Sequence, residues 1–156
     1  MAAKKKQVSR GRSKVVAPKA RRTSAPPALR RNVDPGWTWD DRLPLAQGKQ
    51  IGNTIYVSGQ VAYDPDGNLV GEGDMKAQTR QVFENIRTVL ESAGSSLKDI
   101  VKINTYITDG SKFVDMLAAR SEVFGDDPPA STAVVVAALA FPGLLIEVEA
   151  IAITHA

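Results

Sequence analysis

Hydrophobic and polar residues alternate one by one near the C-terminal end of the chain. Ile146 and Val148 are apolar, whereas Glu147 and Glu149, which alternate with them, carry carboxylates. Successive side chains of a strand point to opposite faces, so residues 145–154 are predicted to form a strand with both carboxylates on one face. Two acids in so apolar a strand indicate either a functional site or a paired structural role.

A run of small and β-branched residues comes before this strand. Residues 129–139 contain four alanines and three consecutive valines, with Pro128 and Pro129 at the start and Pro142 and Gly143 beyond the end. This pattern predicts a strand that is buried on both faces at the centre of the sheet. A tight connection is expected to join it to the C-terminal strand.

Two other segments follow the helical repeat. Apolar residues recur every three or four positions from Asp74 to Ala93, so Asp74 is predicted to cap a helix that Gly94 ends. Ser111 is predicted to cap a second helix. The inward face of this second helix is predicted to carry Phe113, Met116, Leu117 and Phe124.

The remaining patterns complete a fold. Residues 50–53 and 54–60 predict a hairpin, residues 64–68 a tight turn, and residues 101–108 a strand. The order β-β-α-β-α-β-β predicts an α+β domain with one mixed sheet and two helices on one face. With apolar residues expected on both faces of the sheet, the uncovered face is predicted to be rich in Val and Ala and buried between subunits.

Positive charge gathers at the N-terminus. Residues 1–33 hold 11 of the 20 Lys and Arg and none of the 17 Asp and Glu, which leaves 9 basic and 17 acidic residues, a net charge of −8, for residues 34–156. Residues 1–33 also lack aromatic side chains, so they are predicted to form a disordered tail. The single folded domain is predicted to span residues 34–156.

The basic tail fits three interpretations. It could bind nucleic acid or an acidic surface, act as an organelle transit peptide, or have no specific role. Its Lys-rich opening lacks a clear apolar helical face, which argues against a transit peptide. A cytoplasmic location is therefore expected, with organelle targeting as the alternative.

Both tryptophans lie where the folded domain is predicted to begin. Trp37 and Trp39 are flanked by turn-forming residues. Two large aromatic side chains this close together more often fix a segment onto a core than form a platform for a ligand. We expect the packing role, with the platform as the alternative.

The composition excludes several kinds of chemistry. The chain has no Cys and one His, at position 155, so it has no disulfide, thiol nucleophile or thiolate metal site. A single His also argues against a Ser-His-Asp relay and a multi-His metal site, and neither a metal nor another cofactor is expected. The longest apolar stretch, residues 130–146, falls short of a bilayer span, so no membrane segment is expected.

Four segments carry a resemblance to a known family. Residues 51–61, 78–86, 101–109 and 146–152 resemble, in order and spacing, segments of the RidA/YjgF family of reactive-intermediate (enamine/imine) deaminases. The resemblance covers residues 34–156. It implies a chorismate-mutase-like α+β fold, a barrel-like homotrimer and a small-molecule pocket at each subunit interface.

The residues that the resemblance places in the pocket depart from the family pattern. Family deaminases grip the substrate carboxylate with the Arg of a Pro-Ala-Arg-Ser motif, and Ser131 occupies that position here. A pocket Tyr of the family aligns with Leu45, and a pocket Asn aligns with Leu117. A hydroxyl cannot replace a planar guanidinium with its permanent charge, so these changes imply a neutral, more apolar pocket and a substrate other than a 2-imino acid.

Three implied site residues keep the family pattern. Glu147 aligns with the Glu that orients the hydrolytic water, and backbone groups at Gly59 and Ala133 would contact the ligand. Each feature also has a structural interpretation. Gly59 would allow close backbone approach, Ser131 would satisfy the entry into its strand, and Glu147 would be paired.

Two functional classes follow. The first is a hydrolase of a small, uncharged imine, enamine or related C=N compound, in which Glu147 positions a water and backbone groups polarise the substrate. The alternative is a non-catalytic trimer that binds a small metabolite or a protein partner through the same cleft.

Overall fold

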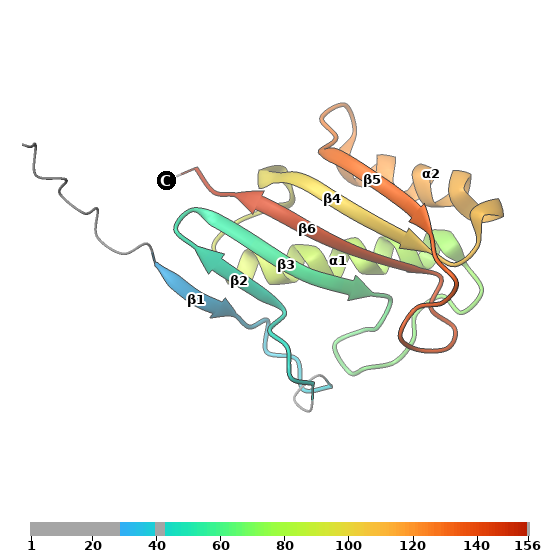
Figure 1. Cartoon of the computed structure of the whole chain (residues 1–156), viewed down its shortest axis with the longest axis horizontal. Coiled ribbons are helices and arrows are strands. Elements are labelled where there is room, and N and C mark those ends of the chain that lie inside the picture. Colours follow the sequence, from blue (N-terminus) through green and yellow to red (C-terminus); the bar gives the residue numbers. More distant parts are fainter. Residues whose placement is uncertain (1–28, 40–42, 156) are drawn as a thin grey trace, which may run out of the picture.

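A computed structural model describes residues 29–39 and 43–155 (Figure 1). These residues form one six-stranded sheet in the order β1-β2-β3-β6-β4-β5, in which β4 and β5 are parallel and all other neighbours are antiparallel. The strands are β1 (Arg30–Val33), β2 (Gly48–Ile51), β3 (Thr54–Val61), β4 (Ile100–Ile107), β5 (Ala130–Val135) and β6 (Ile146–Ile153). The helices are α1 (Met75–Ser92), α2 (Phe113–Phe124) and the short 3-10 helices η1 (Leu97–Asp99) and η2 (Gly110–Lys112). Both long helices lie behind the sheet in Figure 1, so the predicted α+β class and mixed sheet are confirmed.

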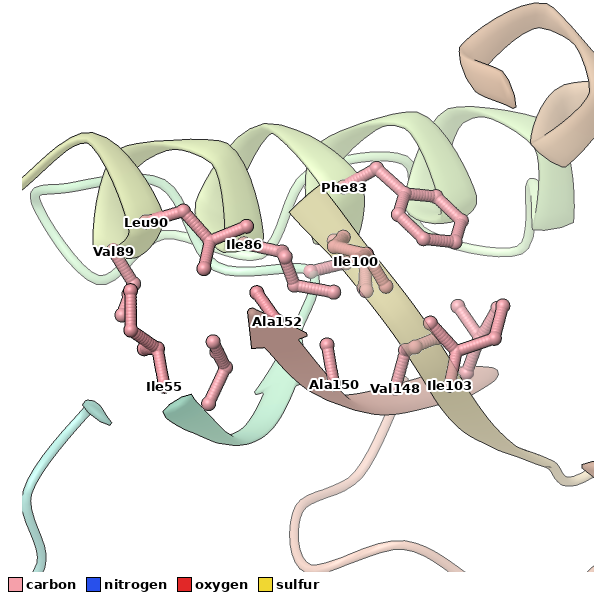
Figure 2. Packing of buried hydrophobic residues seen from close by; sticks show 14 of the residues in the cluster. Ile55, Phe83, Ile86, Val89, Leu90, Ile100, Ile103, Val148, Ala150 and Ala152 are labelled. Atoms are coloured by element: carbon pink, nitrogen blue, oxygen red, sulfur yellow. The ribbon is translucent and has the colours of Figure 1, made fainter. Parts of the chain in front are cut away.

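Helix α1 forms where its apolar periodicity predicts it. The Asp74 carboxylate accepts a hydrogen bond from the Ala77 backbone N–H at 3.1 Å, and Gly94 follows the helix with a φ of 78°. Both ends match the prediction, because an acceptor satisfies free N–H groups at the start and Gly adopts positive φ at the end. Figure 2 shows the core that this helix covers. From α1 it contains Phe83, Ile86, Val89 and Leu90, and from the strands Ile55, Ile103, Val148, Ala150 and Ala152.

Helix α2 differs from its prediction in two ways. Asp109, not Ser111, caps the turn before it, because the Asp109 carboxylate accepts both the backbone N–H (2.9 Å) and the hydroxyl (2.6 Å) of Ser111. Phe113 is 39% exposed and does not point into the core. Met116 is buried, and Phe124 packs edge-on against Phe83 with ring centroids 5.3 Å apart, so the rest of the predicted inward face is confirmed.

The strand β5 lies at the edge of the sheet, where the sequence predicted the centre. It pairs only with β4, and Val134 and Val135 are 43% and 60% exposed. The true central strand is β6, which pairs with β3 and β4. A β-branched run indicates a strand but does not determine its neighbours, and the ten residues 136–145 between β5 and β6 form a loop that is not tight.

The folded domain begins earlier than the predicted residue 34. Strand β1 pairs with β2 along its whole length, and Val33 is buried in the core. Arg31 donates to the Gln50 side-chain oxygen at 2.8 Å and to the Ala93 carbonyl at 3.2 Å, just beyond the end of α1. A cation is favourable at a helix C-terminus, which explains a structured Arg in a basic segment. Residues 1–28, with the prediction of disorder, lie outside the described residues.

The tryptophans pack as expected. Trp37 is buried in the core, and its ring stacks on Trp39 with centroids 6.2 Å apart. The Trp39 ring in turn meets the edge of Tyr63 at 5.6 Å. These contacts favour the packing role over the ligand platform.

The face of the sheet away from the helices is mixed in character. Side chains that alternate with the buried positions point to this face, which we call the open face. It carries Tyr56, Lys102, Asn104, Tyr106, Val134, Glu147, Glu149 and Ile151. The expectation of a Val- and Ala-rich face is therefore wrong, because most of the Val and Ala residues of β5 and β6 lie on the helix side or at the sheet edge.

Candidate active site on the open face of the sheet

Glu147 lies on the central strand β6 with its side chain on the open face. Ile146 and Val148 on either side of it are fully buried beneath the helices, so the predicted alternation is confirmed. Its register partners are Tyr106 on β4 and Val61 on β3. Partial burial of the carboxylate raises the pKa of Glu147, and the charge of Glu149 raises it further.

Gly59 provides the space into which this carboxylate fits. Val57 pairs with Ala150 and Gln60 pairs with Val148, so β3 has one more residue than β6 over this interval and forms a bulge. A Cβ atom on Gly59 would overlap Oε1 of Glu147 and would lie 2.8 Å from its Cδ. The close approach at Gly59 is therefore made by a carboxylate side chain, and any larger residue would displace it.

Glu149 lies two residues along the same face and is held by two donors from β4. The Asn104 side-chain amide donates to Oε1 of Glu149 at 2.6 Å, and the Tyr106 hydroxyl donates to the same oxygen at 3.4 Å. The charge of Glu149, followed by burial, raises the pKa of Tyr106. The phenol consequently keeps its proton and remains a hydrogen-bond donor at neutral pH.

A hollow of about 350 Å³ joins these groups. Tyr106, Glu147 and Glu149 form its polar side. The loop after β5 forms its apolar side with Val136, Ala138, Leu139 and Ala140. Its volume lies at the lower end of the range for small-molecule sites, and convergent polar groups on an apolar wall are typical of such sites.

Ser131 points away from this hollow. Its register partner in the parallel pair is Ile103, which is buried beneath the helices, so Ser131 faces the helix side of the sheet. There its hydroxyl accepts a hydrogen bond from Nη1 of Arg120 on α2 at 2.9 Å. Within the described residues no carboxylate lies within 4.0 Å of the Arg120 guanidinium.

Two other predicted site residues also lie on the helix side. Ala133 pairs with the buried Thr105, and Leu117 on α2 is partly buried; both pack against the core. These three positions, Ser131, Ala133 and Leu117, therefore do not meet Glu147 within one chain. A site containing all of them requires a second copy, whose β5 edge would approach the open face of the first.

Leu45 lies in the loop before β2 and is 51% exposed. The same loop is tied to β3 next to Gly59, because the Ser58 hydroxyl donates to the Ala46 carbonyl at 2.7 Å and the Ser58 N–H donates to the Gln47 carbonyl at 3.0 Å. Leu45 also lines a separate hollow of about 240 Å³. The structure thus connects the segment that carries Leu45 to the bulge at Gly59.

The sequence analysis did not assign Asn104 or Tyr106 to the site. The sequence does indicate that these residues share one face, since Lys102, Asn104 and Tyr106 are the alternate polar positions of a predicted strand. What the sequence could not provide was the neighbour of that strand, because only the pairing of β4 with β6 places Tyr106 opposite Glu147.

Comparison with known proteins identifies the family. The family model described as Endoribonuclease L-PSP matches residues 40–154. The chain belongs to this family, the RidA/YjgF family. A RutC family protein from Pyrococcus abyssi is 45% identical over 109 residues, which cover 70% of this chain and 85% of the relative.

Solved structures of similar proteins agree with the RidA/YjgF assignment. A putative endoribonuclease from Thermotoga maritima has a TM-score of 0.75 and 36% identity, and the match covers 82% of this chain and 100% of that one. RidA from the Antarctic bacterium Psychrobacter sp. has a TM-score of 0.67 and 42% identity, covering 71% and 89%. The predicted family and its α+β fold are confirmed.

Two further properties of this RidA/YjgF chain concern metals and membranes. Across residues 29–39 and 43–155, no three His, Asp or Glu side chains gather closely enough to hold a metal ion. In the same part of the chain, neither long helix combines the length and hydropathy needed to cross a bilayer.

Proposed function

We propose that this RidA/YjgF protein hydrolyses the C=N bond of a small imine or of the imine tautomer of an enamine, with Glu147 as the catalytic carboxylate. The observation that carries the proposal is the placement of Glu147 in the 350 Å³ hollow, above the space left by Gly59 and beside Tyr106 and Glu149. Burial and a neighbouring negative charge raise the pKa of Glu147, as a group that exchanges protons near neutral pH requires.

The proposed reaction needs one proton donor and one water. Protonated Glu147 gives its proton to the imine nitrogen, which makes the carbon more electrophilic. The resulting carboxylate then takes a proton from the water as the water oxygen bonds to that carbon. Transfer of this proton to the nitrogen makes ammonia the leaving group. As the C–N bond breaks, the hydroxyl returns its proton to the Glu147 carboxylate, which releases a carbonyl compound and ammonia and restores protonated Glu147. The Tyr106 phenol keeps its proton and donates it in a hydrogen bond to Glu149, so its role in these steps is to hold the neighbouring carboxylate in place.

The proposed site lies between two copies of the chain in a homotrimer. The open face carries Glu147 and Gly59, whereas Ser131 and Ala133 lie on the edge strand with their side chains on the other side of the sheet. An edge strand with unpaired backbone groups is suited to packing against another copy. In such an arrangement, β5 of one subunit would close the hollow of the next.

We infer that the substrate is uncharged. An anion on the open face would meet the like charge of Glu149 and no cation among the described residues that line the hollow. At the position of the family Arg, Ser131 presents a neutral hydroxyl. The nearby guanidinium of Arg120 reaches that hydroxyl from α2. A carboxylate substrate would depend on Arg120, so Arg120→Gln would abolish its turnover and would leave a neutral substrate unaffected.

The name of the family model also raises RNA cleavage as a function. Phosphate binding requires cations or N–H donors, whereas the hollow presents two carboxylates. Residues 34–156 carry a net charge of −8. The electrostatics of the described site therefore favour an uncharged substrate over a polyanion.

Ammonia release from small imines generated in the assay tests the proposal. Neutral imines and 2-iminopropionate are compared with wild type, Glu147→Gln and Glu91→Gln, the last a matched exposed Glu on α1. We expect turnover of a neutral imine that Glu147→Gln lowers by about 10²- to 10⁴-fold, the usual contribution of an acid–base residue, and that Glu91→Gln leaves unchanged. A folded wild-type protein that turns over no imine would favour the non-catalytic binding trimer.

A substitution at Ser131 tests the substrate charge separately. Ser131→Arg restores the guanidinium of the family motif, but Leu45 and Leu117 still replace the polar pocket residues. Partial gain of 2-iminopropionate turnover is therefore expected. Wild-type turnover of 2-iminopropionate equal to that of a family member with the motif Arg would contradict an uncharged substrate.

A further inference from the structure

Glu149 lies within the same hollow as Glu147 but differs from it in how it is held. Glu149 accepts hydrogen bonds from Asn104 and Tyr106, both on β4, and both bonds reach the same oxygen, Oε1. No hydrogen bond from the described residues reaches the Glu147 carboxylate, which lies over Gly59. One carboxylate is thus fixed by its neighbours, and the other is available to a ligand.

We propose that Glu149, held by Asn104 and Tyr106, is the positioning residue of the site and keeps Glu147 in the protonation state that proton transfer requires. This inference rests on the proposed function. The inference is based on the register of β4 against β6, in which Tyr106 pairs with Glu147 and Asn104 pairs with Glu149. Tyr106 therefore lies next to Glu147 while its hydroxyl reaches diagonally to Glu149.

The charge of Glu149 acts on Glu147 across this arrangement. Two like charges in one partly buried hollow disfavour ionisation of the second group, so the proton remains on Glu147 to a higher pH. Asn104 and Tyr106 fix Oε1 of Glu149 and so set the distance over which the repulsion acts. Without them, Glu149 would turn toward solvent, where water and salt screen its charge.

The other described side chains around Glu147 do not carry a negative charge that could repel its carboxylate. From β4 the titratable side chains on the open face are Tyr106 and Lys102, and the Lys102 ammonium is hydrogen-bonded to the Thr132 hydroxyl at 2.8 Å. The paired segment of β3, residues 59–61, has no titratable side chain, and neither does the loop of residues 136–145. Glu149 is therefore the negative charge that faces Glu147 in the described chain.

Direct titration of the Glu147 side-chain carboxyl by carbon-13 NMR tests this inference on the full chain. Glu149→Gln keeps the shape and an acceptor oxygen but removes the charge, so we expect the titration midpoint of Glu147 to fall to lower pH. The alkaline limb of the pH–rate profile, where Glu147 loses the proton that it must donate, should move to lower pH by the same amount. Tyr106→Phe loosens Glu149 and should give a smaller fall, and Glu147→Gln assigns the titrating signal.

The outcomes separate the two proposals. A Glu147 midpoint that Glu149→Gln leaves unchanged, in a folded protein, overturns the positioning role whether or not the protein hydrolyses imines. A lowered midpoint in a protein that turns over no imine upholds the coupling of the two carboxylates and refutes the proposed hydrolase. Glu122→Gln, which removes an exposed carboxylate that is paired with Arg80, should leave the midpoint unchanged.

Discussion

At the scale of single residues, the site depends on Gly59, because the absence of a side chain there leaves room for the Glu147 carboxylate. Gly59→Ala would place a methyl group where Oε1 of Glu147 lies. The carboxylate would have to move by about an ångström, and displacement of a reacting group by that much costs on the order of a hundredfold in rate. We expect that loss in imine turnover with the fold retained, as measured by ammonia release and circular dichroism. Gly110→Ala is the matched control, since its Cβ would meet only Val135, at 3.3 Å, and activity lost equally there would contradict the assignment.

Glu147 also makes stability depend on pH. Its pKa is raised in the folded state, so the folded protein binds the proton more tightly than the unfolded chain does. The free energy of unfolding therefore falls as pH rises from the unfolded pKa through the raised folded pKa. Glu147→Gln removes this loss, and we expect the variant to melt at a higher temperature than wild type at pH 7.5 but not at pH 3.5. A variant that is less stable at pH 7.5 would show that Glu147 is structurally paired.

At the scale of elements, we expect the folded domain to need β1 for its stability. Val33 lies in the core and Arg31 bonds the chain just beyond the end of α1. Deletion of residues 1–33 should lower the free energy of unfolding by roughly 2–4 kcal/mol, from one buried Val side chain and the hydrogen bonds lost with it. Deletion of residues 1–28 should leave it unchanged. Urea denaturation at equal protein concentration measures both, and equal stability of the two deletions would exclude a structural role for β1.

The elements that sequence predicted best are those whose pattern is local. Helix α1 carries its cap, its apolar repeat and its terminating Gly within one segment, and β6 carries its alternation within eight residues. The edge position of β5 and the existence of β1 depend on which strands pair, which no single segment contains. Arg31 illustrates the limit, because its partner, the Ala93 carbonyl, lies 62 positions away.

The residues of the candidate site likewise divide into those that the sequence indicated and those that depend on strand pairing. Glu147 and Gly59 were predicted from their resemblance to a family, and the structure brings them together. Tyr106 and Asn104 enter the site only through the pairing of β4 with β6. The hydrogen bond from Arg120 to Ser131 joins a helix to an edge strand, and no local sequence pattern predicts it. Site residues that depend on strand pairing or on tertiary contacts could therefore be identified only from the structure.

At the scale of the whole molecule, the open face predicts assembly. It combines the aromatic ring of Tyr56 and the side chains of Ile151 and Val134 with two carboxylates, and the described chain covers it with no helix. An unpaired edge at β5 lies beside it. A surface with exposed apolar side chains and a free strand edge is stabilised by burial against another copy. We expect light scattering at micromolar concentration to give three times the chain mass of 16.7 kDa.

Two matched substitutions locate the contact within that assembly. Val134 is 43% exposed and lies on β5 beside Tyr106, whereas Val114 is 74% exposed on α2. Val134→Asp would bury a third carboxylate between copies on the face that already carries Glu147 and Glu149, at a cost of several kcal/mol, and should shift the protein toward monomers. Val114→Asp stays in water on the helix side and should leave the mass unchanged. A wild-type monomer would refute the assembly, and dissociation by Val114→Asp alone would move the contact from the open face to the helices.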